Sequence, residues 1–149
     1  MLGFRLTMIA TLLIGLSAQA PPGHPAYAAG QVWRYSPRPG DEGSLLKIGR
    51  VETDPAFQQG RPIYHISVIG VHMGVDRHVT EIGHLPVSQE TLDMSVIALS
   101  DSNAPFPNVE NGIEQWRQAK GGVFTLTVAQ IVAVTDRTMQ GVKPTADPH

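Results

Sequence analysis

The chain has 149 residues, no cysteine, 42% hydrophobic residues and a formal net charge of −2 at pH 7. This length fits one domain, and the apolar content is sufficient for a hydrophobic core. The charge gives no basic surface for nucleic acid, so we expect no nucleic-acid partner. The lack of cysteine excludes disulfides, thiolate metal sites and a cysteine nucleophile.

The N-terminus has the pattern of a bacterial signal peptide. Arg5 precedes an apolar run at 6–16, LTMIATLLIGL, which is too short to span a membrane well. Cleavage after Ala20 or Ala28 fits the A-x-A rule, and we favour Ala28 because the other site would leave proline at the new N-terminus. We therefore expect a signal peptide at 1–28, a periplasmic or secreted protein, and no stable membrane insertion after cleavage.

The first half of the remaining chain predicts strands. Alternating apolar residues and turn-rich boundaries place them at 31–35, 44–52, 63–73 and 79–84. Within the third run, His65 and Ser67 share one face and Ile66 lies on the other. The second and third runs should pair as an antiparallel hairpin, with a connecting loop of about ten residues.

The second half predicts helices. Ser88 is a favourable N-cap, and Leu92, Val96 and Leu99 recur at helical spacing, which predicts a helix over 89–100. The same reasoning places two further helices, at 108–120 and 127–139, and one short buried strand between them, at 123–126.

These elements predict an α+β fold: an antiparallel sheet of about four strands with two or three helices packed on one face. The sequence shows no repeat that would divide it further. We therefore expect a single domain over 29–140 and a flexible tail over 141–149, which is polar and contains proline.

Histidines gather in the middle of the chain, where four of the six lie between 65 and 84. Imidazole and carboxylate groups are ligands of zinc and other divalent ions, so His65, His78, Glu81 and His84 form a candidate metal site. Their spacing matches no known metal signature, and hydrogen-bonded structural histidines are the alternative reading. Our first expectation is no cofactor, with a divalent metal such as zinc as the alternative.

A charged loop follows the first aromatic strand. Prolines and Gly40 make this loop stiff, so Arg38, Asp41 and Glu42 should hold fixed positions beside Trp33 and Tyr35. Stiff charged loops next to aromatic residues suit recognition, because little entropy is lost on binding. The alternative is that the aromatic residues fill the core and the loop only turns the chain.

The chain also resembles a family of small uncharacterised bacterial proteins. The shared motifs are W-x-Y at 33–35, R-P-G-D-E at 38–42, Y-H-I-S-V at 64–68 and H-x-P-x-S at 84–88. The resemblance implies a shared fold and carries no activity, cofactor or partner. If the matched polar positions form a site, its candidates are Arg38, Asp41, Glu42, Glu52, His65, Ser67 and His84.

The sequence contains no catalytic signature such as G-x-S-x-G and no phosphate-binding loop. We therefore expect a small exported binding or interaction protein, for example of inhibitor or immunity type, whose partner is an unknown protein or small molecule. The alternative is a small metal-assisted hydrolase that uses the histidine and glutamate residues named above. Whether the protein is an enzyme stays open at this point.

Overall fold

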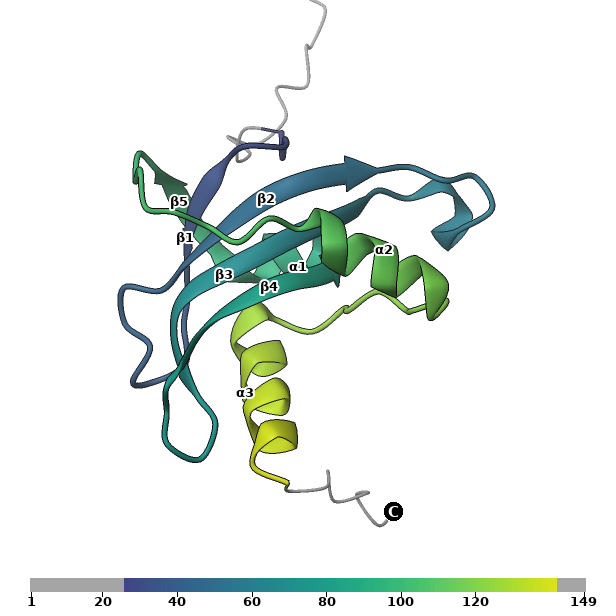
Figure 1. Cartoon of the computed structure of the whole chain (residues 1–149). Coiled ribbons are helices and arrows are strands. Elements are labelled where there is room, and N and C mark those ends of the chain that lie inside the picture. The colour runs from purple at the N-terminus through teal and green to yellow at the C-terminus, as the bar shows by residue number, and fades with distance from the viewer. Residues whose placement is uncertain (1–25, 142–149) are drawn as a thin grey trace, which may run out of the picture.

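The computed structural model describes residues 26–141 (Figure 1). Most of the expected signal peptide, up to residue 25, and the expected tail from residue 142 lie outside the described residues. No helix among the described residues is long and apolar enough to cross a membrane.

The centre of the fold is one antiparallel sheet of five strands in the order β4-β3-β2-β1-β5. The strands are β1 (Val32–Tyr35), β2 (Leu45–Glu52), β3 (Ile63–Met73), β4 (Val79–Val87) and β5 (Val96–Ser100). The expected hairpin is present, because β2 and β3 are antiparallel neighbours.

The helices are α1 (Gln89–Ser95), α2 (Glu110–Gln118) and α3 (Val128–Met139), and a short 3-10 turn lies at Gln58–Gly60. The Ser88 hydroxyl caps α1 by accepting from the backbone N–H of Thr91 at 3.2 Å. Thr127 and Gln130 form a reciprocal capping box at the start of α3. The α+β class is therefore confirmed, with one strand more than expected.

Two expected elements differ from the structure. The helix expected over 89–100 ends at Ser95, and the rest of that segment is β5. The β-branched residues of this last segment can lie in a helix or in a strand. The segment forms a strand because it pairs with β1. The strand expected at 123–126 is reduced to a single bridge between Val87 and Phe124.

The two faces of the sheet differ in polarity. One, which we call the core face, carries the main hydrophobic cluster, in which Ile66 and Val68 of β3 pack with Leu92 of α1 and Ile131 of α3. The other, which we call the polar face, carries Lys47, Arg50, Glu52, His65, Ser67 and His84, as strand alternation and register place them. Helix α2 lies over this second face, opposite α1 and α3 (Figure 1).

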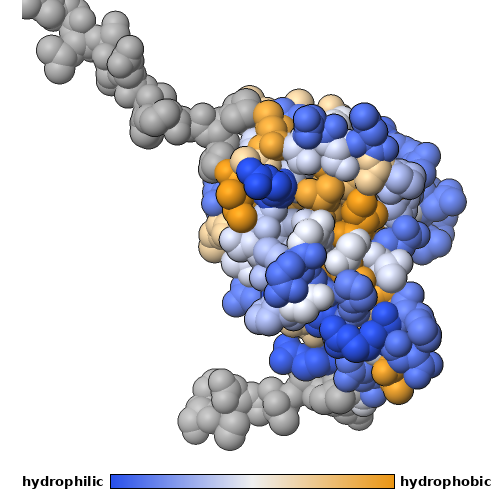
Figure 2. Space-filling view, turned by 90° about the vertical axis from the view of Figure 1, so that its left-hand side faces the viewer, coloured by the Kyte–Doolittle hydropathy of each residue, from blue (hydrophilic) through white to orange (hydrophobic). Residues whose placement is uncertain are grey.

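Both edges of the sheet are short or interrupted. Pro86 can lie inside β4 because β4 is an edge strand, where a missing N–H breaks no ladder. The other edge is β5, on which the side chains of Ile97 and Leu99 are exposed. Figure 2 shows this side of the molecule, where hydrophobic groups lie among hydrophilic ones.

The residues just before β1 belong to the folded unit. The Tyr27 ring packs edge-on against Trp33 and Tyr64, with centroid distances of 5.4 and 5.7 Å. Its hydroxyl donates to Asp93 Oδ1 at 2.8 Å. Cleavage after Ala28 would remove these contacts, whereas cleavage after Ala20 would keep them.

Candidate functional site

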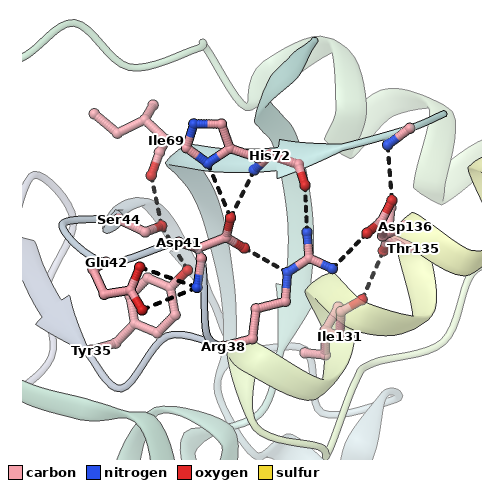
Figure 3. A network of polar contacts seen from close by, with 12 residues as sticks. Tyr35, Arg38, Asp41, Glu42, Ser44, Ile69, His72, Ile131, Thr135 and Asp136 are labelled. Atoms are coloured by element: carbon pink, nitrogen blue, oxygen red, sulfur yellow. Dashed lines mark hydrogen bonds and ion pairs between the residues drawn. The ribbon is translucent and has the colours of Figure 1, made fainter. Parts of the chain in front are cut away.

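Two clusters of buried polar side chains lie against β3. The first, which we call the Arg38 cluster, consists of Arg38, Asp41, Asp136 and the backbone of residues 72–74 (Figure 3). The Arg38 guanidinium donates to Asp41 Oδ2 and Asp136 Oδ2, both at 2.6 Å, and to the carbonyl of residue 72 at 2.7 Å. It therefore joins the loop after β1, the end of β3 and helix α3.

The carboxylates of the Arg38 cluster are also satisfied on their other oxygens. Asp41 Oδ1 accepts from the backbone N–H of His72 at 2.9 Å, and Asp136 Oδ1 accepts from Gly74 N–H at 2.8 Å. Burial opposes the charged form of Asp136, but its bonds to Arg38 and Gly74 outweigh this and lower its pKa. A buried network with all partners in place is typical of structural reinforcement.

The other residues expected near this loop also have local roles. The Glu42 carboxylate accepts from the backbone N–H of Gly40, whose φ of 93° requires glycine. Trp33 and Tyr35 are buried on the core face, and the hydroxyls of Tyr35 and Ser44 lie 2.7 Å apart. The charged groups of this loop are therefore directed inward or onto its own backbone.

The second cluster, which we call the histidine cluster, consists of Glu52, His65 and His84 on the polar face. His65 Nδ1 lies 2.8 Å from His84 Nε2, and the two rings stack with a centroid distance of 5.1 Å. His65 Nε2 lies 3.5 Å from Glu52 Oε2. That contact is an ion-pair distance without hydrogen-bond geometry, so Nε2 of this fully buried imidazole has no hydrogen-bond partner among the described residues.

Irregularities in the sheet position these side chains. The β2–β3 register shifts so that Gly49 and Arg50 together oppose His65. The β3–β4 register shifts so that Gly83 and His84 together oppose Ser67. Such bulges bend a strand and change the direction in which its side chains point, and they are frequent next to functional sites.

Helix α2 closes over the histidine cluster through a glycine. A Cβ at Gly112 would lie 2.3 Å from His84 Cβ, so only glycine lets the helix approach this closely. The Trp116 ring stands edge-on to His65 at a centroid distance of 5.1 Å, and its Nε1 donates to the Gly122 carbonyl at 2.9 Å. The tryptophan thus covers the buried imidazole.

The charges around the cluster set the protonation of the histidines. Glu52 is paired with Arg117 and Arg50. Burial lowers the pKa of His65, which the Glu52 carboxylate only partly opposes. Burial, followed by the neighbouring His65, lowers the pKa of His84 to about 4. Both imidazoles are therefore neutral at pH 7.

A neutral pair has a preferred arrangement of its protons. A carboxylate only accepts hydrogen bonds, so the proton of His65 belongs on Nε2, which faces Glu52. His65 Nδ1 then accepts from His84 Nε2–H. This assignment leaves His84 Nδ1 without a proton, as a hydrogen-bond acceptor or a base.

Two hollows flank Trp116. One, of about 410 Å³, lies beside Glu52 and is also lined by the charged residues Asp54, Arg117 and Lys120. The other, of about 530 Å³, lies between β4 and α2 and is lined by His84, Asn108, Asn111, Gln115, Trp116 and three small residues. Volumes of this order are typical of small-molecule sites.

The structure brings only part of the expected metal set together. His65 and His84 are adjacent, but Glu81 pairs with Ile69, four residues along β3 from His65, and His78 lies before the start of β4. Within residues 26–141, no group of three or more histidine or acidic side chains could hold a metal ion. Ser67 is buried, and its Oγ has no hydrogen-bond partner in the same part of the chain.

Sequence reasoning missed one residue of the Arg38 cluster, Asp136, and the tryptophan that covers the histidine cluster, Trp116. Asp136 has a signal, because it follows Val128 and Val132 at helical spacing and so occupies the buried face of α3. A charge at such a position calls for a buried partner, which is Arg38. Trp116 was expected only as part of a helix face, and no local pattern indicates that it covers His65.

No family model, curated protein or solved structure matches the chain. The family resemblance therefore stays an expectation, and the function must be argued from the geometry of the site.

Proposed function

We propose that this protein is a small binding module whose ligand is a small molecule held at the histidine cluster, between β4 and α2. Export to the periplasm or beyond, as the signal-like N-terminus indicates, is part of this proposal. A role of inhibitor or immunity type is compatible with it, because such proteins act by binding.

One observation carries the proposal: two imidazoles and a carboxylate lie together beneath Trp116, next to two hollows of ligand size. Burying these groups costs stability unless all their atoms are paired, and His65 Nε2 has no hydrogen bond among the described residues. Histidines with shifted pKa values in a cleft are candidates for a functional site. The Arg38 cluster has no such features, so it is the weaker candidate.

The alternative proposal, a metal-assisted hydrolase, has less support. The adjacency of His65 and His84 favours it, since two imidazole nitrogens could share one ion. His78 and Glu81, however, lie toward the opposite end of β4 from this pair, and a catalytic zinc site needs three protein ligands.

A fragment screen tests the binding proposal. The full chain is mixed with neutral, anionic and cationic fragments, and binding is detected by saturation-transfer difference NMR. We expect a subset of the fragments to bind. The substitution His84→Ala should weaken the affinity for these fragments about tenfold, because the lost hydrogen bond and lost packing are together worth about 1.4 kcal/mol.

His78→Ala is the matched control, since it removes a histidine from the same hairpin at its exposed end. Thermal unfolding of both variants shows whether each is folded. The proposal fails if no fragment binds to the folded chain, or if the two variants lose binding equally.

A further inference from the structure

We propose that the ligand of this site is an uncharged saccharide, bound in the hollow between β4 and α2. This inference rests on the proposed function and adds the chemical class of the ligand. It comes from the side chains that line the hollow and from the proton arrangement of the histidine cluster.

Among residues 26–141, no carboxylate, ammonium or guanidinium group lines this hollow. Its polar side chains are the carboxamides of Asn108, Asn111 and Gln115 together with the imidazole of His84. The hollow on the other side of Trp116 is lined by four charged residues instead. A charged ligand in the β4–α2 hollow would therefore lose water without gaining an opposite charge.

The carboxamides form a line along the helix. Asn111 and Gln115 are four residues apart on α2, so they project from the same face, and both are exposed. Asn108 lies one further turn toward the N-terminus, where its Oδ1 accepts from Glu110 N–H and its amide nitrogen has no hydrogen-bond partner within residues 26–141. Each carboxamide offers donors and an acceptor, which match the hydroxyl groups of a sugar.

His84 supplies the opposite wall of the hollow. With the proton of its Nε2 directed to His65, His84 Nδ1 accepts a hydrogen bond from the ligand. A carboxylate has no proton to give at neutral pH and would be repelled by this lone pair. A hydroxyl group can donate to it, so the proton arrangement favours an alcohol over an anion.

Trp116 completes the lining with an apolar surface, and the small residues Gly83 and Ala119 keep the hollow open. Sugar rings present C–H groups on their faces and hydroxyls around their edges, and an indole beside carboxamides complements both. The volume of about 530 Å³ is sufficient for one or two sugar rings.

The test is a titration of the full, isotope-labelled chain followed by 1H–15N correlation spectra. The neutral probes are maltose, cellobiose and N,N′-diacetylchitobiose, and the charged probes are glucuronate and glucosamine. We expect at least one neutral probe to shift the amide signals of residues 83–84 and 108–119, with a Kd of about 1 mM or tighter. The charged probes should leave these signals in place.

Two variants of α2 locate the binding. The double variant Asn111→Leu, Gln115→Leu removes two carboxamides of the hollow and should weaken the neutral saccharide at least tenfold. Gln118→Leu is the matched control, because Gln118 is an exposed residue of the same helix that is not among the lining residues. The Gln118→Leu variant should bind the neutral saccharide with the affinity of the wild type.

The outcomes separate this inference from the proposed function. If charged sugars or fragments of another class bind at the histidine cluster and no neutral saccharide does, the saccharide assignment is wrong and the binding module stands. Unchanged saccharide affinity in the double variant also overturns the assignment. If no compound of any class shifts these signals, both proposals fall.

Discussion

The Arg38 cluster and the histidine cluster both bury charged or polar side chains against β3, but they differ in how completely the atoms are paired. In the Arg38 cluster, each carboxylate oxygen has a donor within hydrogen-bond distance. In the histidine cluster, His65 Nε2 has no hydrogen bond among the described residues. One cluster joins three segments of the chain, whereas the other lies beside two hollows.

The completeness of pairing separates a structural network from a candidate site. Sequence reasoning selects residues of both clusters as candidates, the Arg38 loop as charged groups beside aromatic residues and the histidines as possible metal ligands. Full pairing at Arg38 stabilises the fold and leaves little for a ligand to bind. In the histidine cluster, the half-buried His84 lines an open hollow, so it is the group that a ligand can reach. Variants of the two clusters test this contrast.

Removing the Arg38 side chain should cause the largest loss of stability. Arg38→Ala leaves Asp41 and Asp136 buried without their counter-charge, so we expect a loss of about 3–5 kcal/mol. Urea unfolding measures it. Arg61→Ala is the matched control, because Arg61 forms an exposed pair with Glu90 and should cost at most about 1 kcal/mol.

Equal losses of stability in these two variants would show that the Arg38 cluster is not a structural network.

A second measurement follows the stability of the protein as the pH is lowered. The folded-state pKa of Asp136 is lowered, so its contribution is present above the unfolded-state pKa and is lost as the pH falls toward the folded value. Arg38→Ala should therefore flatten the stability profile below about pH 4.

Gly112→Ala should have an intermediate effect. Alanine normally favours a helix over glycine, but here its Cβ would lie 2.3 Å from His84 Cβ, so α2 must move away from β4. We expect a loss of about 1–3 kcal/mol, together with a shift of the His84 ring signals in NMR. Gly122→Ala, where a Cβ meets nothing within 4 Å, is the control. A stabilised Gly112→Ala variant would contradict the close packing of α2.

A third prediction concerns the pH dependence of the histidine cluster. The pKa of His84 is about 4 in the fold and 6.5 as its ordinary value, so the unfolded chain takes up protons first as the pH falls. Stability should therefore decline between pH 6.5 and 4 and then level off with respect to this group. NMR titration of the His84 ring checks the value directly. A titration midpoint of His84 near 6.5 would contradict the buried neutral pair. So would a pH profile of stability that is unchanged in the double variant His65→Gln, His84→Gln.

Much of the fold could be read from local patterns. Alternation at 63–73 predicts β3 with its correct bounds, and the capping box at Thr127 and Gln130 correctly predicts the start of α3. The segment after Ser95 could not be decided locally, because a β-branched run at helical spacing fits both forms. Pairing with β1, which is some sixty residues earlier in the chain, converts it to a strand.

The candidate site divides in the same way. Local sequence accounts for the residue types, the alternation that puts His65 and Ser67 on one face, and the predicted stiffness of the Arg38 loop. The partners that these residues meet are set by the tertiary structure. It paired Arg38 with Asp136, which is 98 residues away, and stacked His65 on His84 under a tryptophan of α2. Local patterns report backbone preferences, whereas these contacts depend on the order of strands, on two bulges and on a glycine that admits the helix.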